Sequence, residues 1–539
     1  MLKDFVAFFQ KKYWWRIDAF VFSCLFSLWI LAGYNFAFWE KFYLLKPHML
    51  FFISGGIVLF LLAVAGCQIL MFKYTLRFWS FFFCFFNGII FYFMDTYHIP
   101  FDKIMLLNVL ETDPNEVKEI FNFALLGYLL FFFVFPVVLI FKTKIMYKPL
   151  GKEIFRRFLF VLFVCVFLGV LVLESYKTTA QFMRNNRSLR YLLVPANYIG
   201  AVISVTKIKY RSMQRETIRI GDDASLTRYW HDKSKKNLLV LVVGETARAA
   251  NFSLNGYARK TDEKLLKHRD NLLNFTQTFS CGTSTAVSLP CMFSSQGRRD
   301  FDEGESAYRE NLLDVIQKVG YKVLWRENNT GCKGICKRVE TEDMCSSGAC
   351  FDEVLLQNFG EKVRSYHQDM VVVLHQMGSH GPTYYRRYPK QSKIFEPVCN
   401  TERLDNCSRE EIVNVYDNTI AYTAQNLDHL ILELKRLSSE YNVMMVYISD
   451  HGESLGENNI YLHAAPYLIA PKEQKHVPFL VWADDDTIRN LKLNWSCMQR
   501  KQNDLLSHDH LFHSVLGILG IQTDVYDKSL DIWNGCRIK

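Results

Sequence analysis

The first third of the chain is built from long apolar runs, whereas the remainder alternates short apolar and polar stretches. Five runs carry almost no charge, and they lie at 17–39, 48–72, 76–95, 121–141 and 157–175. Each is long enough to cross the ~30 Å hydrocarbon core of a bilayer as a helix. A cleaved signal peptide would give a single short run. The pattern therefore predicts five membrane helices rather than buried helices of a soluble core.

Beyond about residue 235 the pattern changes to that of a soluble α/β domain. Helical periodicity recurs at 308–319 and 411–437. Buried strands are predicted at 237–243, 321–325, 370–375, 443–449 and 477–482. Strands that alternate with helices favour a mostly parallel sheet, in which ligands bind beyond the carboxyl ends of the strands.

These patterns divide the chain into three expected parts. A transmembrane domain of five helices at 1–175 includes an external loop at 96–120. A juxtamembrane linker with short helices is expected at 176–235, and the soluble domain at 236–539.

Positive charge predicts the orientation of the helices. Basic residues cluster before the first run, between the second and third runs, and between the fourth and fifth, whereas 96–120 is net acidic. Because Lys and Arg are enriched on the cytoplasmic side, the N-terminus is predicted to be cytoplasmic and everything after about residue 176 to lie outside. The basic residues of 177–238 suit anionic lipid head groups or a solvated linker. No basic platform interleaved with aromatics is evident, so nucleic acid is not an expected partner.

The cysteines fit that topology. Of 14 cysteines, four lie inside apolar runs and ten lie in the C-terminal half. An even number in close pairs indicates disulfides formed in an oxidising compartment. Sequence proximity favours the pairs Cys281–Cys291, Cys332–Cys336, Cys345–Cys350 and Cys399–Cys407, which leaves Cys497 and Cys536. A zinc–thiolate cluster within 332–350 is the alternative, but its thiols would oxidise outside the cytoplasm.

Carboxylates and imidazoles follow three of the predicted strands. They are Glu245 after the first strand, His375 and His380 after the third, and Asp450, His451 and then His463 after the fourth. Two carboxylates and one histidine suit a divalent metal ion, zinc above all. An Asp-His pair after a strand is more often a turn or a helix cap, but the repetition at three strand ends favours a metal site.

A hydroxyl-rich loop between two cysteines offers candidates for a nucleophile. The stretch SCGTSTAVSLPC at 280–291 holds Thr283, Ser284, Thr285 and Ser288. A metal with three protein ligands keeps one position open, and a hydroxyl needs such activation to attack phosphorus. A helix that begins here would also place backbone N–H groups near an oxyanion. These arguments do not choose among the four hydroxyls.

Five motifs together resemble a known family. They are VVGETARAANFSLNGY, SCGTSTAVSLPCMFS, GCKGICKRV, LHQMGSHGPTYYRRY and YISDHGESLGENNIYLHAAP, in this order. They closely resemble the phosphoethanolamine–lipid A transferases, which include the mobile colistin-resistance enzymes and belong to the alkaline-phosphatase-like superfamily. The resemblance covers nearly the whole chain, including the five-helix membrane part. It implies an alkaline-phosphatase/sulfatase-like α/β fold for 236–539, as a periplasmic catalytic domain.

The resemblance also implies an activity and a location. The chain is then a monomeric enzyme of the Gram-negative inner membrane that moves phosphoethanolamine from phosphatidylethanolamine to a lipid A phosphate, which confers polymyxin and colistin resistance. The family's nucleophile matches Thr285, which would carry the group as a covalent intermediate. The zinc ligands of the family match Glu245, Thr285, Asp450 and His451. Either His380 or His463 would move protons.

Further positions follow from the same resemblance. The phosphoethanolamine pocket matches Asn329, Lys333, His380 and His463, and the two histidines also match residues that take a second zinc ion in some family structures. The loop near the lipid head group matches Asn108, Thr112 and Glu116. Without the resemblance, 106–117 indicates only an amphipathic interfacial segment.

Neighbouring families define the alternatives. Sulfatases need Cys or Ser in C/S-x-P-x-R, whereas Cys281 is followed by Gly-Thr-Ser-Thr. Lipoteichoic-acid synthases transfer glycerol phosphate, usually with manganese, and lack a ladder of five disulfides. A phosphoethanolamine or phosphoglycerol transferase acting on a core sugar or another glycan is the main alternative. A non-catalytic scaffold would be expected to lose a metal ligand or the threonine, and neither is lost.

Two further features have open roles. His508, His510 and His513 are expected on the surface of a helix at 507–517, rather than in a metal or phosphate site. Glu453 either supports the site or caps a helix.

Overall fold

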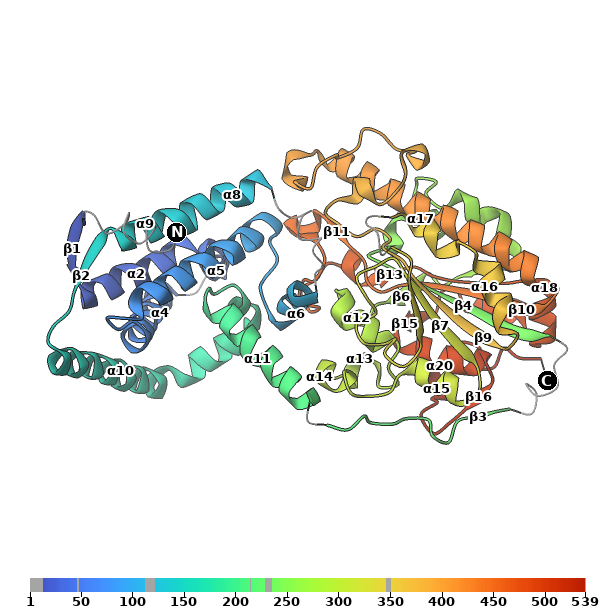
Figure 1. Cartoon of the computed structure of the whole chain (residues 1–539), viewed down its shortest axis with the longest axis horizontal. Helices are drawn as coiled ribbons and strands as arrows, with labels where there is room; N and C mark the ends of the chain where they lie inside the picture. Colours follow the sequence, from blue (N-terminus) through green and yellow to red (C-terminus); the bar gives the residue numbers. More distant parts are fainter. Residues whose placement is uncertain are drawn as a thin grey trace. The chain divides into compact units, whose positions relative to one another are not determined.

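The computed structural model describes residues 13–45, 48–111, 122–213, 215–227, 235–345 and 350–538 (Figure 1). It divides into two compact units, Met1–Leu106 with Phe121–Ile203, and Leu107–Ile120 with Ser204–Lys539. The predicted lipid-side positions Thr112 and Glu116 lie outside the described residues.

Apolar helices form the first unit. Among the described residues, four are long and apolar enough to cross a membrane, namely α4 (Met49–Leu70), α5 (Leu76–Tyr97), the combined helix Phe123–Phe141, and the part Leu150–Leu171 of α10 (Leu150–Asn185). Helices α2 (Ala19–Gly33) and α3 (Phe36–Leu44) make a fifth span if they count as one, although they are bent by 65°. At the bend, the Asn35 side chain donates to the carbonyls of Ile30 and Val194.

Basic residues at the start of α10 bind polar groups at the ends of other helices. Arg157 donates to the carbonyls of Gln68 and Met71, at the C-terminal end of α4, over 2.8 and 2.9 Å. Arg156 pairs at 2.9 Å with Asp18, which caps the N-terminus of α2. Helix termini leave carbonyls and N–H groups without intrahelical partners, so these charges stabilise the helix ends.

The expected linker contains more helix than predicted. It holds the C-terminal part of α10, the short helix η2 (Arg187–Tyr191) and the 18-residue helix α11 (Ala196–Met213).

A seven-stranded sheet organises the second unit. Its order is β5 (Leu272–Asn274), β14 (Phe479–Ala483), β10 (Tyr441–Ser449), β4 (Lys236–Gly244), β9 (Met370–His375), β7 (Lys322–Glu327) and β8 (Glu340–Asp343). The strands from β10 to β8 are parallel, whereas β14 is antiparallel to both β10 and β5. The sheet is therefore mostly parallel, as predicted.

Helices cover both faces of this sheet. Along β4, Leu239, Leu241 and Val243 pack into one buried cluster, and the alternate residues pack into another. Helix α17 (Arg409–Leu437) covers one face, while α15 (Leu312–Lys318) and α20 (Asp509–Ile518) cover the other (Figure 1). Because both faces are buried, the central strands are continuous apolar runs in the sequence.

Five disulfides join described cysteines of the second unit. The bonds are Cys281–Cys291, Cys332–Cys336, Cys345–Cys350, Cys399–Cys407 and Cys497–Cys536. They are the pairs that sequence proximity favours. The alternative of a zinc–thiolate cluster is wrong, because its four sulfurs are bonded in pairs.

Candidate active site

The register of two parallel strands brings the predicted ligands together. The last residues of β4 and β10, Gly244 and Ser449, stand opposite each other. Glu245 and Asp450 follow directly, so both carboxylates emerge at the same edge of the sheet. The backbone N–H of Asp450 donates to the Gly244 carbonyl at 2.9 Å, which extends this pairing past the strand ends.

Glu245, Asp450 and His451 form a buried cluster of candidate metal ligands. One ligand atom from each lies within 4.8 Å of the others. Nε2 of His451 is 3.4 Å from Oε1 of Glu245 and 3.4 Å from Oδ2 of Asp450. Its Nδ1 is 2.8 Å from the Gly452 carbonyl, so we assign the proton to Nδ1 and the lone pair of Nε2 to the cluster.

The electrostatics of this cluster favour a bound cation. Oδ2 of Asp450 is buried and has no hydrogen-bond partner among the described residues. Burial, together with the charge of Glu245, raises the pKa of Asp450. Two adjacent carboxylates and an imidazole lone pair fit a divalent ion such as zinc.

Thr285 faces this cluster from the start of α12 (Thr285–Met292). Its Oγ1 is 3.2 and 3.1 Å from the two carboxylate oxygens of Glu245, and 3.3 Å from Nε2 of His451. The hydroxyl of Thr283 instead donates to the Ala465 carbonyl, and that of Ser288 accepts the Gly282 N–H. The geometry therefore distinguishes Thr285 from its neighbours.

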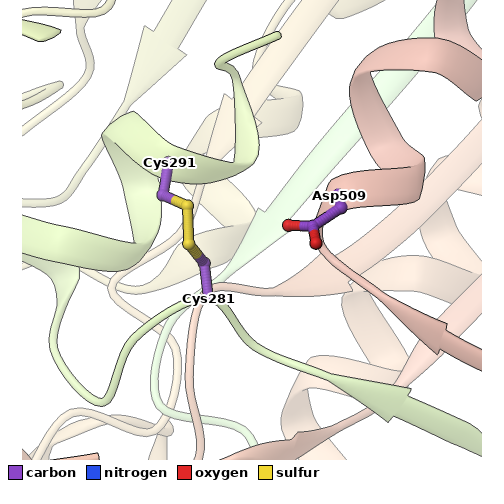
Figure 2. A group of neighbouring side chains, drawn as sticks. All are labelled: Cys281, Cys291 and Asp509. Atoms are coloured by element: carbon purple, nitrogen blue, oxygen red, sulfur yellow. A yellow bond between two sulfur atoms is a disulfide. The ribbon is translucent and has the colours of Figure 1, made fainter. Parts of the chain in front are cut away.

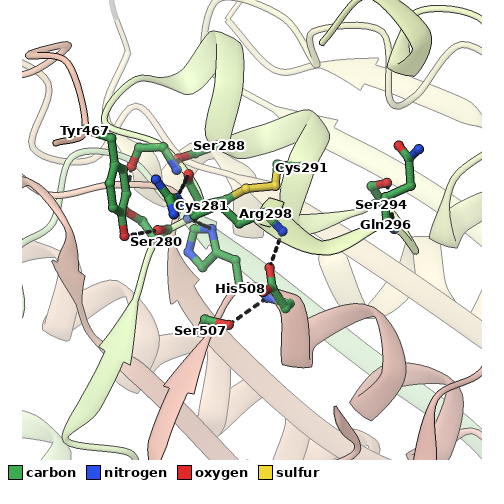
Figure 3. Close-up of a disulfide and its surroundings, with 12 residues drawn as sticks. Ser280, Cys281, Ser288, Cys291, Ser294, Gln296, Arg298, Tyr467, Ser507 and His508 are labelled. Atoms are coloured by element: carbon green, nitrogen blue, oxygen red, sulfur yellow. Dashed lines mark hydrogen bonds between the residues drawn. A yellow bond between two sulfur atoms is a disulfide. The ribbon is translucent and has the colours of Figure 1, made fainter. Parts of the chain in front are cut away.

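Interactions with distant segments hold residues 280–285, which we call the nucleophile loop. The Cys281–Cys291 disulfide closes it onto α12, and the Tyr467 hydroxyl donates to the Ser280 carbonyl at 3.1 Å (Figure 3). Cys281, Cys291 and Asp509 also lie close together (Figure 2). They do not form a metal site, because both sulfurs are consumed by the disulfide. Asp509 instead accepts the backbone N–H of Arg298 at 2.7 Å.

His380, His463 and Glu453 form a second side of the site, which we call the histidine wall. The rings of His380 and His463 are 5.3 Å apart, and those of His463 and His451 are 4.6 Å apart. Nδ1 of His463 lies 3.3 Å from Glu453, which is fully buried and therefore supports the site rather than capping a helix. Nδ1 of His380 is buried without a partner in the described part of the chain.

The pKa values of the two histidines of the wall are shifted in opposite directions. Burial lowers the pKa of His380 to about 3. Burial also disfavours protonation of His463, but the charge of Glu453 and its hydrogen bond outweigh this effect and raise the pKa of His463 to about 9. The nearby carboxylate of Glu453 therefore distinguishes His463.

Asn329 reaches the same cluster. Its Nδ2 lies 3.1 Å from Oε2 of Glu245 and 2.8 Å from the Gln376 carbonyl. Lys333 follows within the loop closed by Cys332 and Cys336, has a positive φ of 49°, and donates to the Thr330 carbonyl at 3.3 Å. Asn108 lies on α6 (Lys103–Glu111).

Sequence reasoning named His375 only as an imidazole at a strand end, without a role of its own, and missed Asp352 and Gly378. His375 is fully buried, with Nε2 3.2 Å from Nδ2 of Asn329. Asp352 is buried and accepts the N–H of Met377 at 3.0 Å, which holds the loop after β9. Gly378 has a φ of +53°, and a Cβ there would lie 2.6 Å from the Glu245 carbonyl. Nothing local in the sequence marks Asp352, because its partners are distant along the chain.

The prediction of surface histidines at 507–517 is wrong for two of the three. His508 and His513 are buried, and only His510 is partly exposed. Each accepts a backbone N–H, from Cys281, Asp527 and Ser507 respectively. The apolar spacing of α20 could not reveal these long-range partners.

Comparisons with known proteins agree on one family. A family model described as phosphoethanolamine transferase EptA/EptB matches 59–210, and a sulfatase model matches 237–521. The phosphoethanolamine transferase EptA of Escherichia coli K12 is 41% identical over 463 residues, which is 83% of each chain. The phosphatidylethanolamine transferase Mcr-1 of Escherichia coli is 33% identical over 541 residues, covering 95% of this chain and 97% of the relative.

A solved structure is similar over almost the whole length. The integral membrane lipooligosaccharide phosphoethanolamine transferase EptA of Neisseria meningitidis has a TM-score of 0.91 and 35% identity. The match covers 97% of this chain and 100% of that one.

Proposed function

Since this chain belongs to the phosphoethanolamine transferase family, we propose that it moves phosphoethanolamine from phosphatidylethanolamine to a phosphate of lipid A, by way of Thr285. The observation that carries this proposal is the position of the Thr285 hydroxyl, 3.1–3.3 Å from Glu245 and His451. The chain is an integral inner-membrane transferase whose catalytic domain lies in the periplasm, so its substrates are lipids of the outer leaflet of that membrane. We keep 1–175, 176–235 and 236–539 as its proposed domains.

Glu245, Thr285, Asp450 and His451 would hold a zinc ion. When bound, the ion lowers the pKa of a coordinated hydroxyl and stabilises negative charge on phosphoryl oxygens. The unpartnered Oδ2 of Asp450 and the orientation of the His451 ring support this donor set. A second zinc at His380 and His463 stays a prediction, since those histidines belong to neither three-ligand group found in the described part of the chain.

The residues of the chain would then act in two steps. In the first, the Thr285 hydroxyl gives up its proton and Oγ1 forms a bond to phosphorus, while the bond from phosphorus to the diacylglycerol oxygen breaks and that oxygen takes up a proton. In the second, a phosphate oxygen of lipid A attacks the phosphorus, and Thr285 leaves and regains its proton. Asn329, Lys333 and the histidine wall would bind the phosphoethanolamine group, and Nδ1 of His380 is available to carry a proton.

Mass spectrometry of lipid A tests this proposal. Cells that express the chain should add one phosphoethanolamine to a lipid A phosphate and become less susceptible to colistin, whereas cells that express Thr285→Ala should do neither. Unmodified lipid A together with modified core sugar or another glycan would show that the acceptor is wrong. Metal analysis of the purified protein tests the zinc assignment separately.

A further inference from the structure

A buried histidine outside the proposed ligand set connects the nucleophile loop with the strand that carries the metal ligands. Nδ1 of His508 accepts the backbone N–H of Cys281 at 3.1 Å, and Nε2 donates to the Ser449 carbonyl at 3.0 Å. Cys281 belongs to the nucleophile loop, and Ser449 directly precedes Asp450. A single imidazole ring therefore connects both halves of the reaction centre.

Strand pairing explains how His508 reaches this place. The short strand β15 (Leu505–Ser507) runs parallel to β6 (Gln277–Phe279), with Ser507 opposite Phe279. The next residues on both strands emerge side by side, and the N–H of His508 donates to the Phe279 carbonyl at 3.0 Å. The ring of His508 lies next to Cys281 at the base of the nucleophile loop (Figure 3).

The two partners of the ring determine its tautomer. A backbone N–H can only donate and a carbonyl can only accept, so Nδ1 carries the lone pair and Nε2 carries the proton. Full burial agrees with a neutral ring, because it lowers the pKa of His508 to about 4. A rigid ring with one acceptor and one donor fixes the spacing between the two backbone segments.

The residue after His508 reinforces the same arrangement. Asp509 accepts the backbone N–H of Arg298 at 2.7 Å, and Nε of Arg298 donates to the Cys281 carbonyl at 3.0 Å. His508 thus holds the backbone N–H of Cys281, and Arg298, which is itself bound by Asp509 at the start of α20, holds the Cys281 carbonyl.

We propose that His508 is a positioning residue that sets the distance between the Thr285 hydroxyl and the cluster of Glu245, Asp450 and His451. The hydrogen bonds of its ring go to Cys281 and Ser449 rather than to the cluster side chains, so it acts through these two backbone segments. This inference rests on the proposed function, in which Thr285 is the nucleophile. Misplacing a reacting atom by ~1 Å can lower the rate by about 10²-fold, so replacing the ring should lower kcat measurably.

His513 provides a matched control on the same helix. It is also buried, and its Nδ1 also accepts one backbone N–H, that of Asp527 at 2.9 Å. Its ring contacts are with Phe512 and Tyr526. His508→Leu and His513→Leu therefore each remove a buried hydrogen-bond acceptor. Only His508→Leu also removes the two hydrogen bonds that connect the nucleophile loop to β10.

The experiment uses the full chain purified in detergent, with phosphatidylethanolamine in mixed micelles as the donor. Melting temperature, zinc content, kcat, KM and the rate of adduct formation on Thr285 are measured for both variants. Both should melt at lower temperature than the unsubstituted chain and retain its zinc content. His508→Leu should lower kcat and the adduct rate by about 10- to 100-fold with KM unchanged within about twofold, while His513→Leu leaves all three near their original values.

Two conservative variants give a second measurement that does not depend on His508→Leu folding. His508→Asn keeps an acceptor near the position of Nδ1, and His508→Gln keeps a donor near that of Nε2. Each retains one of the two contacts, so each should lose less activity than His508→Leu. If the leucine variant does not fold, the expected result is a loss of kcat by about 10-fold in each conservative variant.

The outcomes separate this inference from the proposed function. Equal kcat for the folded His508→Leu and His513→Leu proteins, or unchanged kcat in both conservative variants, would overturn the positioning role alone. Absence of a Thr285 adduct in the unsubstituted chain would overturn the proposed function, and this inference with it.

Discussion

The nucleophile loop and the histidine wall both lie beside His451, but the fold holds them differently. The loop is anchored by a disulfide and by hydrogen bonds to Tyr467, Arg298 and His508. The wall retains two buried polar atoms without a hydrogen-bond partner in the described part of the chain, Nδ1 of His380 and Oε2 of Glu453, whereas the loop retains one, Oγ of Ser284. A buried polar group left unpaired costs about 1–3 kcal/mol.

This difference indicates that the loop and the wall have different roles. The fold holds the loop of the proposed nucleophile, Thr285, in advance, whereas the wall keeps more unused hydrogen-bonding capacity for a polar head group. The nucleophile side is therefore expected to respond to mutation through kcat, and the wall through substrate binding as well. The predictions below test this contrast, starting with the largest effect.

Replacing Thr285 with alanine should abolish transfer. Activity should fall by about 10³-fold or more, because no other hydroxyl of the loop reaches Glu245. Mass spectrometry should find no phosphoethanolamine on the Thr285→Ala protein, and an adduct there would disprove the assignment. Thr285→Ser retains the hydroxyl and serves as the control, with partial activity.

Removing one carboxylate of the ligand cluster should remove the metal. Asp450→Asn keeps the shape of the side chain but loses its charge. The zinc content should therefore fall below one ion per chain, and the activity should fall by about 10²-fold or more. Elemental analysis and turnover check both. Asp509→Asn is the control for zinc content, since Asp509 lies beside two bonded sulfurs; an equal loss of zinc there would contradict the site.

His380→Gln should reduce activity without reducing stability. Because Nδ1 of His380 makes no hydrogen bond within the described chain, the substitution removes no hydrogen bond of that nitrogen, and the melting temperature should stay within about 2 °C. Activity should fall by about 10- to 100-fold, with a higher KM. His429→Gln, on the exposed side of α17, should leave both unchanged. A large drop in melting temperature for His380→Gln would show that the wall is held as tightly as the loop.

Opening the Cys281–Cys291 disulfide should have the smallest effect on chemistry. The double variant Cys281→Ser/Cys291→Ser should lose about 2–3 kcal/mol of unfolding free energy and a few-fold in kcat. Opening Cys399–Cys407 should lower the unfolding free energy by a similar amount, because the two bonds close loops of similar length, with sequence separations of 10 for Cys281–Cys291 and 8 for Cys399–Cys407. It should leave kcat unchanged. Thermal unfolding and turnover at low temperature measure the two effects. Equal kcat in both variants would show that hydrogen bonds alone position the loop.

The sequence predicted the parts of the site that depend on local pattern. Apolar runs placed β4, β9 and β10, and the residues after them include Glu245, Asp450 and His451. The choice of Thr285 among four hydroxyls came from the resemblance to a family. The structure adds a reason for that choice, since the partners of Thr283 and Ser288 lie elsewhere.

Features that depend on pairing between distant segments could not be predicted. The antiparallel direction of β14 and the burial of His508 both follow from strand pairs far apart in the chain. The bend between α2 and α3 depends in part on Val194, more than 150 residues away. Periodicity reports which face of an element is buried, but not which element covers it.

The order of the five disulfides bears on how the protein is made. Every bond joins two cysteines that follow one another among the ten of the periplasmic domain, so no bond encloses or interleaves with another. A chain that is threaded across the membrane from its N-terminus exposes each cysteine together with its correct partner before the next pair arrives. Oxidation in order of emergence is therefore expected to yield the native bonds directly, without an isomerase to reshuffle wrong pairs.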